Sequence, residues 1–192
     1  MLKQFIKGFA MLLVLTVLTG IAYPLVVTGL AQLFFPRQAN GSVVYNNGQA
    51  VGSQVIGQNF SASKYFQSRP SDAGKDGYDA TASSGSNLGP TNQDLLQDVA
   101  ERAATIRQAN GLSPNQAVPA DLVTASASGL DPDITPEGAM LQVPRIAKLR
   151  NLPLETVQNL VQRDTTPRQL GLFGEPRVNV LRLNLDLDSL MK

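Results

Sequence analysis

A long uncharged segment near the N-terminus constrains this chain more than any other feature. No Asp, Glu, Lys or Arg occurs from Gly8 to Pro36, where the sequence reads GFAMLLVLTVLTGIAYPLVVTGLAQLFFP. A helix needs ~20 mostly apolar residues to cross the ~30 Å hydrocarbon core of a bilayer, and a longer one can tilt. A cleaved signal peptide would have only ~7–15 apolar residues before a small-x-small site. We therefore expect an uncleaved membrane anchor over residues 1–36 and a soluble domain over residues 37–192.

The charges that flank the anchor favour one orientation in the membrane. Lys3 and Lys7 precede the anchor and Arg37 follows it. Basic residues are retained preferentially on the cytoplasmic side. The N-terminus, a short cytoplasmic stub, is therefore expected inside the cell and the soluble domain outside.

Three residues within the anchor suit packing against other membrane helices. Thr16 and Gly20 form a small-xxx-small pair, and Pro24 frees a backbone carbonyl. A lone anchor also tolerates these residues, so both interpretations stay open.

The amino-acid composition excludes several classes of function. The 192 residues include no Cys and no His, so a disulfide, a thiol nucleophile, a Cys-type zinc site, a Ser-His-Asp triad and a histidine-ligated haem are all excluded. The formal net charge is +1 with no block of Lys and Arg, which argues against binding of nucleic acid. Hydrophobic residues make up 43% of the chain, enough for a core in the soluble part.

Turn and alternation patterns predict strands at both ends of the soluble part. Asn46-Asn47-Gly48 is a strong hairpin signal between two β-rich pieces. Near the C-terminus, leucines alternate with polar residues from Leu181 to Asp188, which predicts a half-buried strand. With helices between these strands, we expect an α+β fold with a C-terminal β-strand.

Capping residues predict three helices between these strands. A helix capped by Asn92 should end at Gly111. Thr135, followed directly by a proline, is a typical helix start. Pro144 lies inside the same apolar pattern and should kink or split that second helix. A third, short helix is expected within residues 154–161.

Two short motifs suggest chemistry, and each has a simpler explanation. Ser61-Ala62-Ser63-Lys64 matches the S-x-x-K of penicillin-binding enzymes, but the S-D-N and K-T-G motifs are missing, so chance is the better explanation. The pattern D-x-D-x-T-x-E from Asp131 to Glu137 resembles the start of a calcium loop or an aspartyl-phosphate motif. An EF-hand loop would need Gly and Glu where this chain has Pro136 and Gln142. A turn followed by a helix N-terminus explains the carboxylates.

Two loops of small polar residues remain as candidate sites, at residues 83–92 and 124–131. Such loops can offer backbone N–H groups to an anion, or they can be turns where only small residues fit. We favour packing or a protein contact. The candidate contacts to a nucleotide or partner are Ser126, Ser128, Gly129 and Asp131. The candidate contacts to a partner alone are Ser86, Asn87 and Gly89.

Several blocks of the sequence match a known family in order and spacing. After the single N-terminal anchor come IGQNF, YFQSRPS, SSGSNLGPTN, DLVTASASGLDPDITPEGAMLQVPRIAKLR and GEPRVNVLRLNLDLD. Together they resemble the C subunit of the Kdp potassium-transporting P-type ATPase of bacteria and archaea, the KdpC family, over nearly the whole chain. One residue departs from the pattern: the chain has Asp133 where the family resemblance leads us to expect His.

The resemblance implies an accessory subunit of a four-protein inner-membrane complex. Its partners would be a channel-like potassium-translocating subunit, a P-type ATP-hydrolysing subunit and a small membrane peptide. The subunit would have no catalytic residues and no metal of its own. It would be needed for assembly, and would act as a catalytic chaperone that raises the ATP affinity of the hydrolysing subunit in a transient ternary complex. ATP would then be a shared cofactor, and the anchor near residues 9–33 would pack against the channel-like subunit.

The expected orientation conflicts with a direct contact to cytoplasmic ATP. Either the positive-inside interpretation is wrong, or the effect on ATP affinity passes through the membrane helices. Two other functions remain as alternatives. One is a membrane-anchored extracytoplasmic ion- or solute-binding module that uses Asp131, Asp133 and Glu137. The other is an anchored enzyme that uses Ser61 and Lys64.

Overall fold

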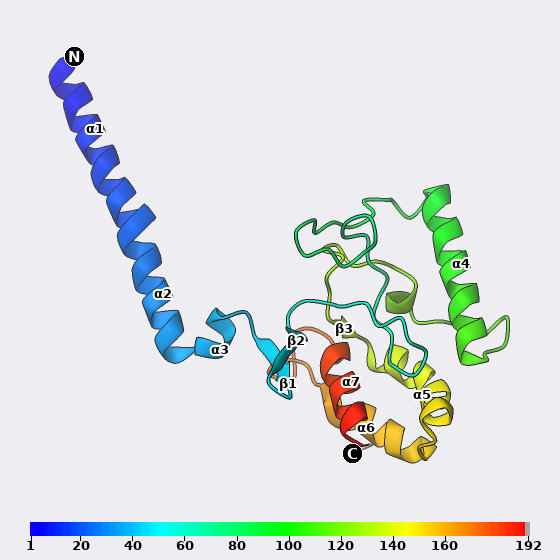
Figure 1. The fold of residues 1–192 in the computed structure, drawn as a ribbon. Coiled ribbons are helices and arrows are strands. Elements are labelled where there is room, and N and C mark those ends of the chain that lie inside the picture. Colours follow the sequence, from blue (N-terminus) through cyan, green and yellow to red (C-terminus); the bar gives the residue numbers. More distant parts are fainter. Residues whose placement is uncertain (191–192) are drawn as a thin grey trace.

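A straight helical rod stands apart from the folded domain in the computed structural model, which describes residues 1–190 (Figure 1). The rod consists of α1 (Leu2–Val17), the π turn η1 (Leu18–Ala22) and α2 (Tyr23–Phe34). It is 33 residues long, its most apolar stretch of 18 residues has a mean hydropathy of 2.3, and none of that stretch is buried within the chain. The rod is therefore long and apolar enough to cross a membrane, as the sequence predicts.

The π turn coincides with the helix distortion expected at Pro24. Proline has no N–H, so the Gly20 carbonyl loses its usual partner four residues later. The Tyr23 N–H donates to the Leu18 carbonyl, five residues earlier, which widens the turn just before Pro24. The Thr19 hydroxyl donates to the Leu15 carbonyl at 2.7 Å, so this polar group has a hydrogen-bond partner within the rod.

A short helix and a hairpin connect the rod to the domain. Helix α3 (Pro36–Ala39) is followed by strands β1 (Val43–Asn46) and β2 (Gln49–Ser53), which pair antiparallel. Asn47 and Gly48 have φ values of 50° and 79°, the left-handed pair that a two-residue type I′ turn requires. The predicted Asn-Gly hairpin is therefore confirmed.

The predicted helix caps are confirmed in the domain. Asn92 accepts hydrogen bonds from Asp94 N and Leu95 N at the start of α4 (Gln93–Asn110). The Thr135 hydroxyl accepts from Gly138 N at the start of α5 (Pro136–Arg150). Helix α5 runs unbroken through Pro144, so this proline does not split it. Helix α6 (Leu154–Asp164) extends slightly beyond the predicted range.

The C-terminal leucine alternation is a helix, which corrects the predicted strand. Strand β5 (Arg177–Asn179) ends before it, and α7 (Val180–Ser189) contains the whole alternating run. Asn179 caps α7 by accepting from Arg182 N at 3.2 Å. Val180, Leu183 and Leu187 follow the i, i+3, i+7 spacing of a helix face and are at most 1% exposed. The run fits the two-residue period of a strand and also places apolar residues on one face of a helix. The cap at Asn179 and the buried face show that it is a helix.

Helices α5, α6 and α7 pack around a small sheet and enclose the core. Strands β3 (Asp133–Ile134), β5 and β4 (Thr165–Thr166) form the antiparallel order β3-β5-β4. A single turn of 3₁₀ helix, η2 (Ala120–Leu122), precedes this unit. The buried core contains Phe66, Leu122, Ile134, Ala139, Val143, Ile146, Ala147, Val157, Leu160, Val161, Val178, Val180, Leu183 and Leu187. The α+β fold predicted from the sequence is confirmed.

The long irregular segment after β2 is held to the helices by buried polar side chains. Gln142 accepts from Gln67 N at 2.8 Å and donates to Gln67 O at 3.2 Å. Arg145 on α5 donates to the carbonyls of Ser63 and Tyr65. These bonds satisfy backbone groups that lack a strand partner, so the segment keeps one defined path without secondary structure.

Candidate functional site

The two loops of small residues lie side by side although some forty residues separate them. Ser84 N donates to Ser128 O at 3.1 Å, and the Ser83 hydroxyl donates to the same carbonyl at 2.9 Å. The Ser71 hydroxyl donates to Gly129 O at 2.6 Å from a third segment. The predicted loops therefore form one structural unit at the edge of the domain.

Close backbone contacts explain why residues in this unit are small. Gly129 has a φ of 66°, and a Cβ added there would lie 2.5 Å from Ser84 O and 2.7 Å from Ala73 N. A Cβ on Gly85 would lie 3.0 Å from Ala127 O. A side chain at position 129 would therefore clash with the backbone of Ser84 and Ala73, and it would also be strained by its own left-handed φ. The tight packing expected from the sequence is present at these glycines.

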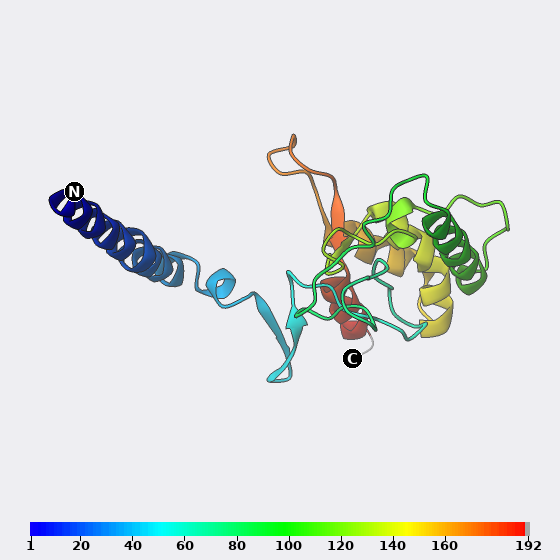
Figure 2. The same cartoon turned by 90° about the horizontal axis from the view of Figure 1, so that it is seen from above.

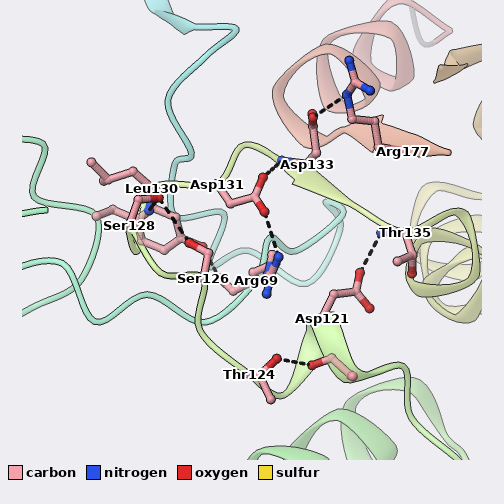
Figure 3. Close-up of polar contacts among 12 residues, drawn as sticks. Arg69, Asp121, Thr124, Ser126, Ser128, Leu130, Asp131, Asp133, Thr135 and Arg177 are labelled. Carbon is pink, nitrogen blue, oxygen red and sulfur yellow. Dashed lines mark hydrogen bonds and ion pairs between the residues drawn. The ribbon is translucent and has the colours of Figure 1, made fainter. Parts of the chain in front are cut away.

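The hydroxyl and amide groups at the turn bond to one another. The Ser128 hydroxyl accepts from Leu130 N at 3.1 Å and lies 3.4 Å from the Ser126 hydroxyl (Figure 3). Gly129 N donates to Ser126 O at 3.1 Å. The N–H groups of Gly129 and Leu130 are thus already engaged within the turn, which reduces what the turn can offer to an anion.

Asp131 forms an ion pair that ties the turn to the irregular segment. Its Oδ2 lies 2.8 Å from Arg69 Nη1, and its Oδ1 accepts from Asp133 N at 3.0 Å (Figure 3). The hydroxyl of Tyr78 donates to the Arg69 carbonyl and so fixes the backbone that carries this arginine. Burial raises the pKa of the Tyr78 phenol, with a further contribution from the Asp131 charge.

Asp133 pairs with a different arginine and points away from Asp131. Arg177 Nε lies 3.0 Å from Asp133 Oδ2 (Figure 3), and Asn179 Nδ2 donates to Asp133 Oδ1 at 3.0 Å. Burial raises the pKa of the Asp133 carboxyl, the Asp131 charge adds to this, and the bonds from Asn179 and Arg177 oppose it. Each carboxylate of the D-x-D pair has its own arginine, so the geometry gives no support to a shared cation site.

The rest of the D-x-D-x-T-x-E pattern serves the start of α5. The Asp121 carboxylate accepts from Thr135 N at 2.6 Å while the Thr135 hydroxyl caps the helix (Figure 3). Glu137 is exposed in the first turn, where a carboxylate interacts favourably with the helix dipole. The structure therefore agrees with the turn and helix N-terminus inferred from the sequence.

The outer part of the first loop lies at the surface. Ser86, Asn87 and Gly89 are exposed. Asn87 has a φ of 53° and donates to Gly85 O at 3.3 Å, which closes a local turn. A Cβ on Gly89 would meet no heavy atom within 4 Å. This stretch is therefore free to contact another molecule.

A cavity of about 430 Å³ opens beside Arg69, on the side of the unit that faces α4. Its walls combine aromatic and aliphatic side chains with two guanidinium groups. The residues that define it are Phe60, Arg69, Tyr78, Arg102, Ile106 and Leu122. Arg102 lies 3.7 Å from Asp72 and from Asp98, so its charge is partly compensated.

Comparison with known proteins identifies the family. A model of the family described as KdpC, K+-transporting ATPase, c chain, matches residues 5–189. The chain belongs to the KdpC family. It is 56% identical over 190 residues to the potassium-transporting ATPase KdpC subunit of Mycobacterium bovis, covering 99% of this chain and all of the relative. The KdpC subunit of Acidobacterium capsulatum is 60% identical over 174 residues, 91% of each chain.

The arrangement found in this KdpC family member includes polar residues that sequence reasoning missed. Arg69, Gln142, Arg145 and Asn184 hold the loops and the irregular segment in place. A signal for three of them exists: Gln142 and Arg145 interrupt the apolar face of α5, and Asn184 interrupts that of α7. A polar residue on an otherwise buried face must find a partner, which points to a nearby segment without its own backbone pairing.

Proposed function

We propose that this chain is the non-catalytic accessory subunit of an ATP-driven, high-affinity potassium uptake complex and is needed for assembly of that complex. The observation that carries the proposal is its membership of the KdpC family over residues 5–189. Relatives that match nearly the whole chain are named potassium-transporting ATPase KdpC subunits. The proposed partners are the channel-like subunit, the P-type ATP-hydrolysing subunit and the small membrane peptide.

The apolar rod is proposed as the anchor that docks to the channel-like subunit. It is apolar on all sides, which is expected of a helix that contacts lipid or other membrane helices. Thr16 and Gly20 would allow close approach of a neighbouring helix. The proposed location is the inner membrane of a bacterial or archaeal cell, with a single crossing and residues 37–192 outside, in agreement with Lys3 and Lys7 in the first turns of the rod.

We propose that the loop unit acts on ATP affinity indirectly, through contact with a partner subunit. Ser86, Asn87 and Gly89 present an exposed surface for that contact. The turn from Ser126 to Asp131 would support this surface from beneath, since its groups are bonded to each other and to Arg69. A direct nucleotide contact by Ser126, Ser128, Gly129 and Asp131 is the competing form of the proposal.

Purification of the assembled complex tests both forms. The full chain, carrying Ser86→Leu, Ser128→Leu or the control Ser113→Leu in the exposed loop after α4, is expressed with its partner subunits. A partner contact predicts that Ser86→Leu releases the chain during purification in detergent, whereas Ser113→Leu stays bound. A nucleotide contact predicts that Ser128→Leu stays assembled and raises the KM for ATP. Recovery of the unmodified chain alone from native membranes would overturn the proposed function.

A further inference from the structure

The connection between β4 and β5 projects from the domain, and its end, residues 168–175, is called the tip below. Figure 2 shows this connection, in orange, extending away from the helices that enclose the core. At its end Leu170, Leu172 and Phe173 are 89%, 75% and 63% exposed. Three large apolar side chains within four residues thus face solvent, although the domain has a well-packed core nearby.

The tip has a defined structure of its own. Gln169 N donates to Phe173 O at 2.8 Å, and Phe173 N donates to Gln169 O at 2.9 Å. Arg168 and Glu175 form an ion pair across the base of the tip. The three apolar side chains are therefore presented by a closed turn, which lowers the entropy lost when they bind.

Local structure does not account for the leucine at position 170. Leu170 has a φ of 54°, a left-handed conformation that costs a residue with a Cβ about 1–2 kcal/mol and that Gly or Asn adopts more easily. Its side chain gains no burial within the domain in return. An exposed apolar side chain at a strained position indicates a contact outside the chain.

The rod limits what the tip can meet. Helix α2 ends at Phe34 and β1 begins at Val43, so only residues 35–42 separate the two. Even fully extended, that segment spans at most ~30 Å. If the rod crosses a bilayer, the domain cannot leave its surface, and the tip meets lipid at a high effective concentration.

The small size of the tip favours lipid over a protein as the occupant. A stable protein interface buries ~800 Å² on each partner, far more than three side chains can supply, whereas a tethered domain needs only a shallow second attachment. From Arg163 to Arg182 the chain has four arginines and two carboxylates. Both carboxylates, Asp164 and Glu175, lie against arginines of the same stretch. Arg163 and Arg177 also pair with Asp186 and Asp133 outside this stretch, so the charges near the tip nearly balance and the apolar side chains carry the attachment.

We propose that Leu170, Leu172 and Phe173 insert into the boundary between headgroups and acyl chains of the bilayer that holds the rod. The domain then has two attachments to the membrane, the rod and the tip, which fix its orientation at the surface. This inference rests on the proposed membrane anchor, not on the identity of the partner subunits.

Depth-dependent quenching of a fluorescent probe tests the insertion. The chain has no native Cys, so Leu172→Cys can carry a single environment-sensitive fluorophore on the full-length protein. The protein is reconstituted in vesicles of phosphatidylcholine and phosphatidylglycerol that contain a lipid with a spin label near the headgroup. Ser113→Cys, in the exposed loop after α4, is the matched surface control, and Val14→Cys reports on the rod.

Insertion predicts loss of most of the fluorescence at position 172 and none at position 113, and the additional change Phe173→Ser should reduce the loss at 172. Quenching at position 14 without quenching at 172 would overturn the inference and leave the anchor intact. If position 14 is also unquenched, the anchor and the inference both fail. A probe at position 172 could also remain unquenched in vesicles and change its emission only when the partner subunits are present. That result would show that the tip contacts a protein and would overturn the inference.

Discussion

The side chain of Asn184 binds both backbone polar groups of Phe66, a residue 118 positions earlier in the chain. Its Oδ1 accepts from Phe66 N at 2.8 Å, and its Nδ2 donates to Phe66 O at 2.9 Å. Phe66 is fully buried, and Asn184 is 2% exposed. A side-chain amide on α7 thus takes the place of a neighbouring strand, because it supplies the same donor and acceptor that a strand would offer.

Loss of this amide should destabilise the domain strongly. Asn184→Leu keeps the size of the side chain but leaves two buried backbone groups unpaired, for an expected cost of about 2–4 kcal/mol. Urea unfolding of the full chain in detergent, followed by circular dichroism, measures the cost. Asn159→Leu makes the same chemical change on the exposed face of α6 and should alter the unfolding free energy by less than about 0.5 kcal/mol. Equal effects at the two positions would contradict the role of Asn184.

A methyl group at Gly129 should disrupt the loop unit. Gly129→Ala places a Cβ 2.5 Å from Ser84 O at a φ of 66°, so both backbone and neighbour must move. We expect a loss of about 1–3 kcal/mol in the same unfolding assay. Gly89→Ala is the matched control, because its Cβ would enter open space. A variant Gly129→Ala as stable as Gly89→Ala would show that the loops do not pack as described.

The stability contribution of Asp164 should fall as the pH rises. Burial raises the pKa of its carboxyl above the usual 3.8, the neighbouring Asp186 adds to this, and Arg163 opposes it. The folded state then binds the proton more tightly than the unfolded state, so stability is greatest below pH 3.8 and declines until the folded pKa is passed. Asp164→Asn lacks this titration. Between pH 3.5 and pH 7 the free energy of unfolding of the variant should therefore rise relative to that of the unmodified chain.

Asp79 provides a control with the opposite sign. Hydrogen bonds from the hydroxyl and the backbone N–H of Thr81 lower the pKa of its carboxyl. The unfolded state therefore binds the proton more tightly, and the contribution of Asp79 is lost as the pH falls through its folded pKa. Asp79→Asn should lose stability relative to the unmodified chain as the pH rises over the same range. Parallel pH profiles for the two variants would refute this assignment.

A cysteine at position 189 should be accessible from outside the cell. Ser189 ends α7 and is exposed. Ser189→Cys would be the only thiol in the chain, so a membrane-impermeant reagent added to intact cells should label it. Leu2→Cys, at the other end of the rod, should react only with a permeant reagent. The reverse pattern would place the domain in the cytoplasm and make a direct contact with ATP possible.

The parts of the fold that depend on local chemistry were predictable from the sequence. Asn92 and Thr135 cap their helices, and Asn47 with Gly48 forms the hairpin turn, because each needs only neighbours a few residues away. The leucine run from Leu181 to Leu187 was predicted wrongly, since its spacing satisfies both a strand and a helix face. Only the cap at Asn179 and the packing against α6 distinguish the two.

The arrangement of the candidate site was predictable only in part. The small residues near Gly129 indicated close packing, but nothing in the sequence states that Ser84 is the neighbour. The pairing of Asp131 with Arg69 spans 62 positions and follows no periodic pattern. Segments that lack secondary structure are held by single side chains from distant elements, and no local rule specifies such partners.

The dependence of Phe66 on Asn184 also sets the order in which the domain can form. The backbone N–H and C=O of Phe66, near the start of the domain, have no side-chain partner until α7 has been synthesised. Closure of the core around Phe66 therefore waits for the last helix of the domain. A chain shortened before α7 would accordingly leave the backbone groups of Phe66 without a partner and this part of the core open.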